Sequence, residues 1–141
     1  MVDEHLSDSA ARTRALARVV GPYLVVMAAA LFVRHDTLAL LLPAFMEDGP
    51  LVLATGAFTL MAGLAILALH HHWSSPPAIA ISLIGAISTL KGAALMAAPH
   101  FGAPLAAFAA STPPMMLVAA LLALLAGAWL TFVGWFSGTR A

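Results

Sequence analysis

Four long runs of apolar residues, separated by short polar segments, dominate the hydropathy pattern of this chain. They cover residues 19–33, 51–69, 78–98 and 115–136. About 20 helical residues cross a bilayer core, and the last three runs are close to that length. The first run is shorter, but Arg18 and Arg34 at its ends can direct their charged groups toward the lipid headgroups and so lengthen the span. The pattern predicts four transmembrane helices.

The segments between the runs are short, and several contain proline. Pro50 and Pro99 stand at run boundaries, where proline begins or ends a helix. The continuous runs, rich in Ala and Leu, lack the alternation of membrane-spanning strands. We therefore predict an all-α integral membrane protein, folded as an antiparallel bundle of four transmembrane helices. Its predicted parts are a polar N-terminal segment over 1–18, the transmembrane domain over 19–136 and a short tail over 137–141.

A weak internal repeat relates the two halves of the chain. After the first run come His35, Ala44-Phe45, Pro50 and Gly63, and after the third come His100, Ala107-Phe108, Pro113 and Gly127. Such a repeat predicts two tandem helical hairpins related by an axis along the membrane normal. The alternative is that an alanine-rich chain with four spans produces these matches by chance.

Composition supports a membrane protein and excludes several chemistries. The chain is 62% hydrophobic and 9% charged, and its mean hydropathy is +1.00. Soluble domains carry about 25% charged residues. The chain has no cysteine, which excludes disulfides, thiolate catalysis and iron-sulfur clusters. Its net charge is zero and it has no basic stripe, so we expect no nucleic-acid partner.

The arginines indicate the orientation of the predicted bundle. One side holds Arg12, Arg14, Arg18 and Arg140, and the other holds Arg34 together with Asp36, Glu47 and Asp48. Because positive residues favour the cytoplasmic side, both termini are predicted to be cytoplasmic. The N-terminal segment is too long and too acidic for a cleavable signal peptide, so we expect the first helix to be retained.

Glycines recur at heptad spacing on three of the predicted helices. The pairs are Gly56 and Gly63, Gly85 and Gly92, and Gly127 and Gly134. Residues seven apart share one helix face, where glycine lets two helix backbones approach closely. We expect these faces to be the helix contacts, although glycine is also common in transmembrane helices for reasons of composition alone.

Lys91 is the only charged residue inside the four apolar runs. An unpaired cation in mid-membrane costs about 2.5 to 3.5 kcal/mol, and helical side chains lean toward the N-terminus, away from the nearer surface. We therefore expect a partner, either Asp36, Glu47 or Asp48 or a free backbone carbonyl. One interpretation is an ion pair that joins helices. The others are a role in handling ions, protons or an anionic ligand, and a lysine that reaches the headgroups without a partner.

Three consecutive histidines, His70, His71 and His72, follow the second apolar run. Successive helical residues point about 100° apart, so the three cannot all bind one metal unless the turn unwinds. Their simplest role is interfacial, beside Trp73, as caps of the helix C-terminus and headgroup contacts. Trp135 is the matching interfacial anchor on the last helix. Metal or haem ligation by one of these histidines is the alternative.

Two further histidines, His35 and His100, follow the first and third runs. With a nearby carboxylate they form a candidate metal site, or a proton relay to Lys91. The alternative is that both are ordinary interfacial residues. We predict no resident cofactor, and metal or haem remains the alternative.

Part of the sequence resembles a known type of protein. The residues concerned are Gly63-Leu64-Ala65, His70-His71-His72-Trp73, Ile84-Gly85, Lys91-Gly92 and Pro99. They resemble small bacterial inner-membrane proteins of unknown function, which have four predicted helices, a histidine-tryptophan end to the second helix and a Lys-Gly pair in the third. The resemblance implies a four-helix fold and a bacterial inner membrane, and it implies no activity. DoxX-like proteins are similar only in size and topology.

Three functions are compatible with these features. The first is a non-enzymatic inner-membrane protein that assembles with itself or acts as an accessory subunit of a larger membrane complex. The second is a small transporter or channel with a pathway past Lys91, although no acidic residue lies within a span to drive cation coupling. The third is a redox component that binds metal or haem through the histidines. The expected partners are the lipid bilayer and other membrane subunits.

Overall fold

The computed structural model describes residues 2–70, 73 and 75–136. These residues form six helices: α1 (Val2–Val33), α2 (His35–Glu47), α3 (Gly49–Leu69), α4 (Pro76–Ala97), α5 (Pro99–Ser111) and α6 (Pro113–Phe136). Proline stands in the first turn of α3 and α4, where its missing N–H is tolerated. The Asp48 side chain accepts a hydrogen bond from the Leu51 N–H at 3.0 Å and so caps the start of α3.

Four of these helices are long and apolar enough to cross a membrane. The candidate spans are Ala10–Val33, Gly49–Leu69, Pro76–Ala97 and Pro114–Phe136. The prediction of an all-α membrane protein with four spans is therefore confirmed. Helix α1 continues from Val2 through the predicted boundary at residue 18, and it buries Thr13 and Ala17. The predicted tail over 137–141 lies outside the described residues.

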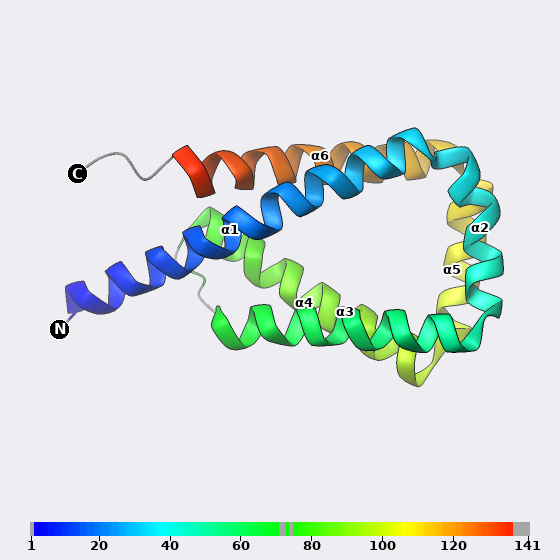
Figure 1. The fold of residues 1–141 in the computed structure, drawn as a ribbon, viewed down its shortest axis with the longest axis horizontal. Helices are drawn as coiled ribbons and strands as arrows, with labels where there is room; N and C mark the ends of the chain where they lie inside the picture. The colour runs from blue at the N-terminus through cyan, green and yellow to red at the C-terminus, as the bar shows by residue number, and fades with distance from the viewer. Residues whose placement is uncertain (1, 71–72, 74, 137–141) are drawn as a thin grey trace.

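The long helices pack as two antiparallel pairs (Figure 1). Helix α1 lies along α6, and α3 lies along α4, while the shorter α2 and α5 lie side by side across one end. At the other end, called the terminal end here because α1 begins and α6 ends there, α1 crosses α4 (Figure 1). From this crossing the two pairs diverge toward α2 and α5. The buried core of Ala17, Val20, Ile81 and Leu130 lies where the pairs meet.

The tandem hairpins expected from the sequence are not packing units. Helices α1 and α3, which are connected by α2, hardly touch, because each packs on a long helix from the other half of the chain. Every close pair of long helices therefore joins one half of the chain to the other.

The two halves repeat with a constant offset of 64 residues. Val33 and Ala97 end the first long helices, His35 and Pro99 begin the short ones, and Gly49 and Pro113 begin the next long ones. The same offset relates α1 to α4 and α3 to α6, so the α1·α6 pair is equivalent to the α4·α3 pair. A two-fold axis along the bundle would relate the pairs in this way. In the sequence comparison, His35 was matched with His100. The structure corrects this by one position, because His100 is equivalent to Asp36.

Glycines form a seam along each helix pair. The α3·α4 seam contains Gly56, Gly63, Gly85 and Gly92, and the α1·α6 seam contains Gly21, Gly127 and Gly134. A Cβ at Gly63 would lie 2.9 Å from the Gly85 carbonyl oxygen, and a Cβ at Gly127 would lie 2.9 Å from the Gly21 carbonyl oxygen. The seams are thus equivalent in the two halves. All six glycines expected at helix contacts lie in them, and Gly21 is an addition.

Candidate functional site

A buried polar junction connects three long helices at the terminal end. His70 follows the last residue of α3, and its imidazole lies between α1 and α4. Its Nε2 atom is 2.7 Å from the Thr13 hydroxyl on α1, and its Nδ1 atom is 3.2 Å from the Ser82 hydroxyl on α4. The exposed fraction is 0% for His70 and 1% for Ser82, and Thr13 is also buried. We call these three residues the His70 junction.

Local structure explains why His70 points inward. Helix α3 ends at Leu69, and His70 takes an extended conformation with φ −153° and ψ 107°. Its N–H still donates to the Ile66 carbonyl at 2.8 Å, which ends the helix without an unsatisfied donor. The turn between α3 and α4 therefore begins with a buried side chain.

The chemistry of the His70 junction suits a structural link. A neutral imidazole has one nitrogen that donates and one that accepts, and a hydroxyl can do either. The two hydroxyls can therefore satisfy either tautomer of His70, and both can accept if the ring is protonated. A buried polar group that is fully hydrogen-bonded holds its neighbours in one arrangement. The junction thus connects the two helix pairs at their crossing.

The expectation of an interfacial role for His70 is wrong, because this side chain is fully buried. Its neighbours His71 and His72 lie outside the described residues. Trp73 and Trp135 are exposed, as an interfacial tryptophan would be. The junction was hard to predict, since Thr13 lies in a segment expected to be outside the membrane and Ser82 belongs to no recognisable motif.

Arg18 occupies the equivalent place in the other helix pair. By the 64-residue offset, Arg18 corresponds to Ser82, and Gly134 corresponds to His70. The Arg18 Nε–H donates to the Gly134 carbonyl at 2.7 Å, and its guanidinium lies 5.6 Å from the centre of the Trp135 ring. Each helix pair is thus tied at the terminal end by a polar contact at the same position.

Replacing Arg18 by methionine is expected to lower the free energy of unfolding by about 1 kcal/mol, because a charged hydrogen bond and a cation–π contact are lost. Arg14→Met is the matched control, since among the described residues the Arg14 guanidinium hydrogen-bonds only to the Ala10 carbonyl of its own helix. Unfolding in mixed detergents, followed by Trp135 fluorescence in a protein whose other tryptophans are phenylalanine, measures both variants. Equal losses for the two would contradict this role of Arg18.

Lys91 has no partner among the described residues. It is exposed on α4 and makes no ion pair or hydrogen bond there. Asp36 instead lies 3.2 Å from His35, Asp48 caps α3, and Glu47 is exposed on α2. The expected ion pair within the chain is therefore wrong. The reason is helical phase: Gly92 faces α3, so Lys91, one residue earlier, points about 100° away from that contact.

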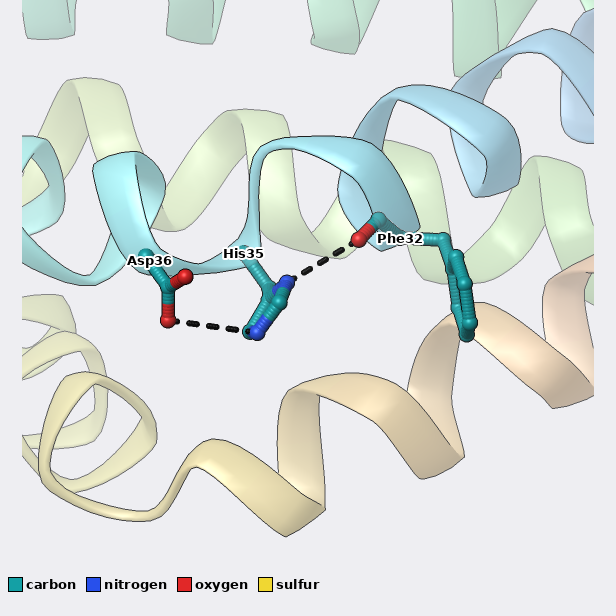
Figure 2. Close-up of polar contacts among 3 residues, drawn as sticks. All are labelled: Phe32, His35 and Asp36. Carbon is teal, nitrogen blue, oxygen red and sulfur yellow. Dashed lines mark hydrogen bonds and ion pairs between the residues drawn. The ribbon is translucent and has the colours of Figure 1, made fainter.

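The candidate metal site at His35 and His100 does not form. Figure 2 shows the His35 ring between two groups of its own segment, with Nδ1 3.0 Å from the Phe32 carbonyl oxygen and Nε2 3.2 Å from the Asp36 carboxylate. Helices α2 and α5 run in opposite directions (Figure 1). His35 at the start of α2 and His100 near the start of α5 therefore lie at opposite ends of this helix pair. The His100 ring lies 4.5 Å from the Phe101 ring, centre to centre, and the two planes are tilted by 40°. Within the described part of the chain, no three His, Asp or Glu side chains are grouped to bind a metal ion.

Two threonines in the glycine seams bond to their own helices. The Thr89 hydroxyl donates to the Gly85 carbonyl at 2.8 Å, and the Thr131 hydroxyl donates to the Gly127 carbonyl at 2.7 Å. Such bonds satisfy a hydroxyl within the membrane without a partner helix. They leave these hydroxyls in structural roles.

Comparison with protein-family models, with curated proteins and with solved structures found no match for this chain. The resemblance to small four-helix bacterial proteins therefore stays a prediction.

Proposed function

We propose that this protein is a non-enzymatic membrane subunit, which assembles with itself or with other membrane proteins. The observation that carries the proposal is the size of its exposed surface. The chain exposes 9201 Å², whereas a compact folded protein of 14.5 kDa exposes about 6,900 Å². The open arrangement of the helices fits this difference, because the two helix pairs meet at the terminal end and diverge toward α2 and α5 (Figure 1).

The excess, about 2,300 Å², is larger than the roughly 800 Å² that one partner contributes to a protein–protein interface of standard size. Much of the exposed surface is made by large apolar side chains on all four spans. Lipid acyl chains can cover such side chains, but they provide no anion for the exposed Lys91. A protein partner can cover the apolar surface and also neutralise the lysine.

The location proposed for this subunit is the bacterial inner membrane with both termini in the cytoplasm. The support is the arginine pattern, because Arg12, Arg14 and Arg18 all lie near the terminal end. Helix α1 begins and α6 ends at that same end (Figure 1).

Purification from native membranes in mild detergent, followed by native mass spectrometry, tests the proposal. We expect a mass well above the 14.5 kDa of a single chain, from further copies or from other polypeptides. A monomer of 14.5 kDa across the mildest detergents would contradict it. Metal content and a visible spectrum are recorded on the same sample, because stoichiometric metal or a haem band would favour the redox alternative.

A further inference from the structure

We propose that the outward face of α4 binds a membrane-spanning helix of a different protein, and that this helix carries an aspartate or glutamate within its span, paired with Lys91. The inference rests on the proposed function and names the chemistry of the partner.

The outward face of α4 has the pattern of a helix-docking surface. Leu83, Ile87, Leu90 and Ala94 are exposed and follow one another at intervals of four, three and four residues. This spacing places them along one stripe of the helix. Leu90 is the most exposed of the three large side chains in this stripe, at 73%. Lys91 is exposed beside this stripe, so the surface is apolar with a single positive charge.

The other half of the chain contains an equivalent face without the charge. On α1 the exposed residues are Val19, Tyr23, Val26 and Ala30, each 64 positions before its counterpart on α4. Met27 occupies the position of Lys91. The two faces therefore differ mainly in charge, so a partner that carries a carboxylate would bind α4 in preference to α1.

A second copy of this chain does not offer the required carboxylate. All six acidic residues, which are Asp3, Glu4, Asp8, Asp36, Glu47 and Asp48, lie outside the four candidate spans. Lys91 lies six residues before the end of α4, which places its Cα about 9 Å inside the span. In a second copy with the same orientation, no carboxylate is attached at that depth.

A lipid phosphate is also a poor match for Lys91. The nearer headgroups lie beyond the C-terminal end of α4, whereas helical side chains lean toward the N-terminus. The ammonium group is therefore directed deeper into the span, and a carboxylate on a neighbouring helix at that depth is the acceptor that fits.

Binding of designed single-span peptides to the reconstituted protein tests this inference. The probe is a leucine-rich transmembrane peptide with one glutamate about 9 Å from its end, and its twin carries glutamine. Fluorescence energy transfer in zwitterionic vesicles reports association. We expect the glutamate peptide to bind the wild-type protein about 5- to 30-fold more tightly than the glutamine peptide.

Lys91→Met should abolish this preference, and Met27→Leu, at the equivalent position of the other half, should retain it. Equal binding of both peptides to the wild-type protein would overturn the inference. It would also be overturned if Lys91→Met removed self-association instead, or if Lys91→Met changed peptide binding only in vesicles that contain anionic lipid. The proposed function is tested separately, because it is contradicted only if native mass spectrometry finds a monomer.

Discussion

Replacing Gly92 by alanine is expected to lower the free energy of unfolding by about 3 kcal/mol, because the new methyl group has no space in the α3·α4 seam. A Cβ at Gly92 would overlap the backbone nitrogen of Leu60 and would lie 2.6 Å from the Leu60 Cα and 2.8 Å from the Gly56 carbonyl oxygen. Backbone atoms cannot rotate away as the end of a side chain can. The helices must therefore separate along the seam, which loses dispersion contacts over their length.

Gly49→Ala is the matched control for this change. A Cβ at Gly49, the first residue of α3, would have no atom within 4 Å. We expect a change within about 0.5 kcal/mol, measured by unfolding in mixed detergents. Similar losses at Gly92 and Gly49 would show that the destabilisation does not come from the seam.

Replacing His70 by alanine is expected to lower the free energy of unfolding by about 2 to 3 kcal/mol. The substitution leaves a cavity at a fully buried position, and it removes the hydrogen bonds to Thr13 and Ser82. Because these bonds connect α1 and α4, the crossing of the two helix pairs should loosen. Spin labels on α1 and α4 should then report a broader distance distribution, in a chain that has no native cysteine to remove.

The control for His70 is His100→Ala, because His100 is exposed on α5. Its loss should change the free energy of unfolding by no more than about 0.5 kcal/mol. His70→Gln should recover part of the stability, since an amide can donate to one hydroxyl and accept from the other. An unchanged distance distribution in His70→Ala would mean that the junction does not set the crossing.

The hydropathy pattern was sufficient to predict the four spans, since a bilayer core requires long apolar helices. Heptad spacing also located Gly63, Gly85 and Gly92, because glycine is needed wherever two backbones meet. Both signals are local in the sequence. They required no knowledge of which helices pair.

The pairing of the helices was not predictable in the same way. Contacts such as that between Thr13 and His70 join residues 57 positions apart, and no local pattern records them. The prediction that Lys91 pairs with an acidic residue of this chain was wrong for a related reason. An apolar run indicates which residues lie within the membrane, but it does not indicate which side of α4 faces the other helices. The repeat was found in the sequence, and its constant offset is also visible there, because Gly21 and Gly85, and Gly63 and Gly127, are each 64 positions apart.

The most direct test of a membrane subunit is photo-crosslinking from the outward face of α4 in native membranes. A photoreactive amino acid at Leu90, which is exposed beside Lys91, samples whatever covers that face. We predict a discrete adduct with a second polypeptide, lost when Lys91 is methionine. Adducts with lipid alone would contradict the account.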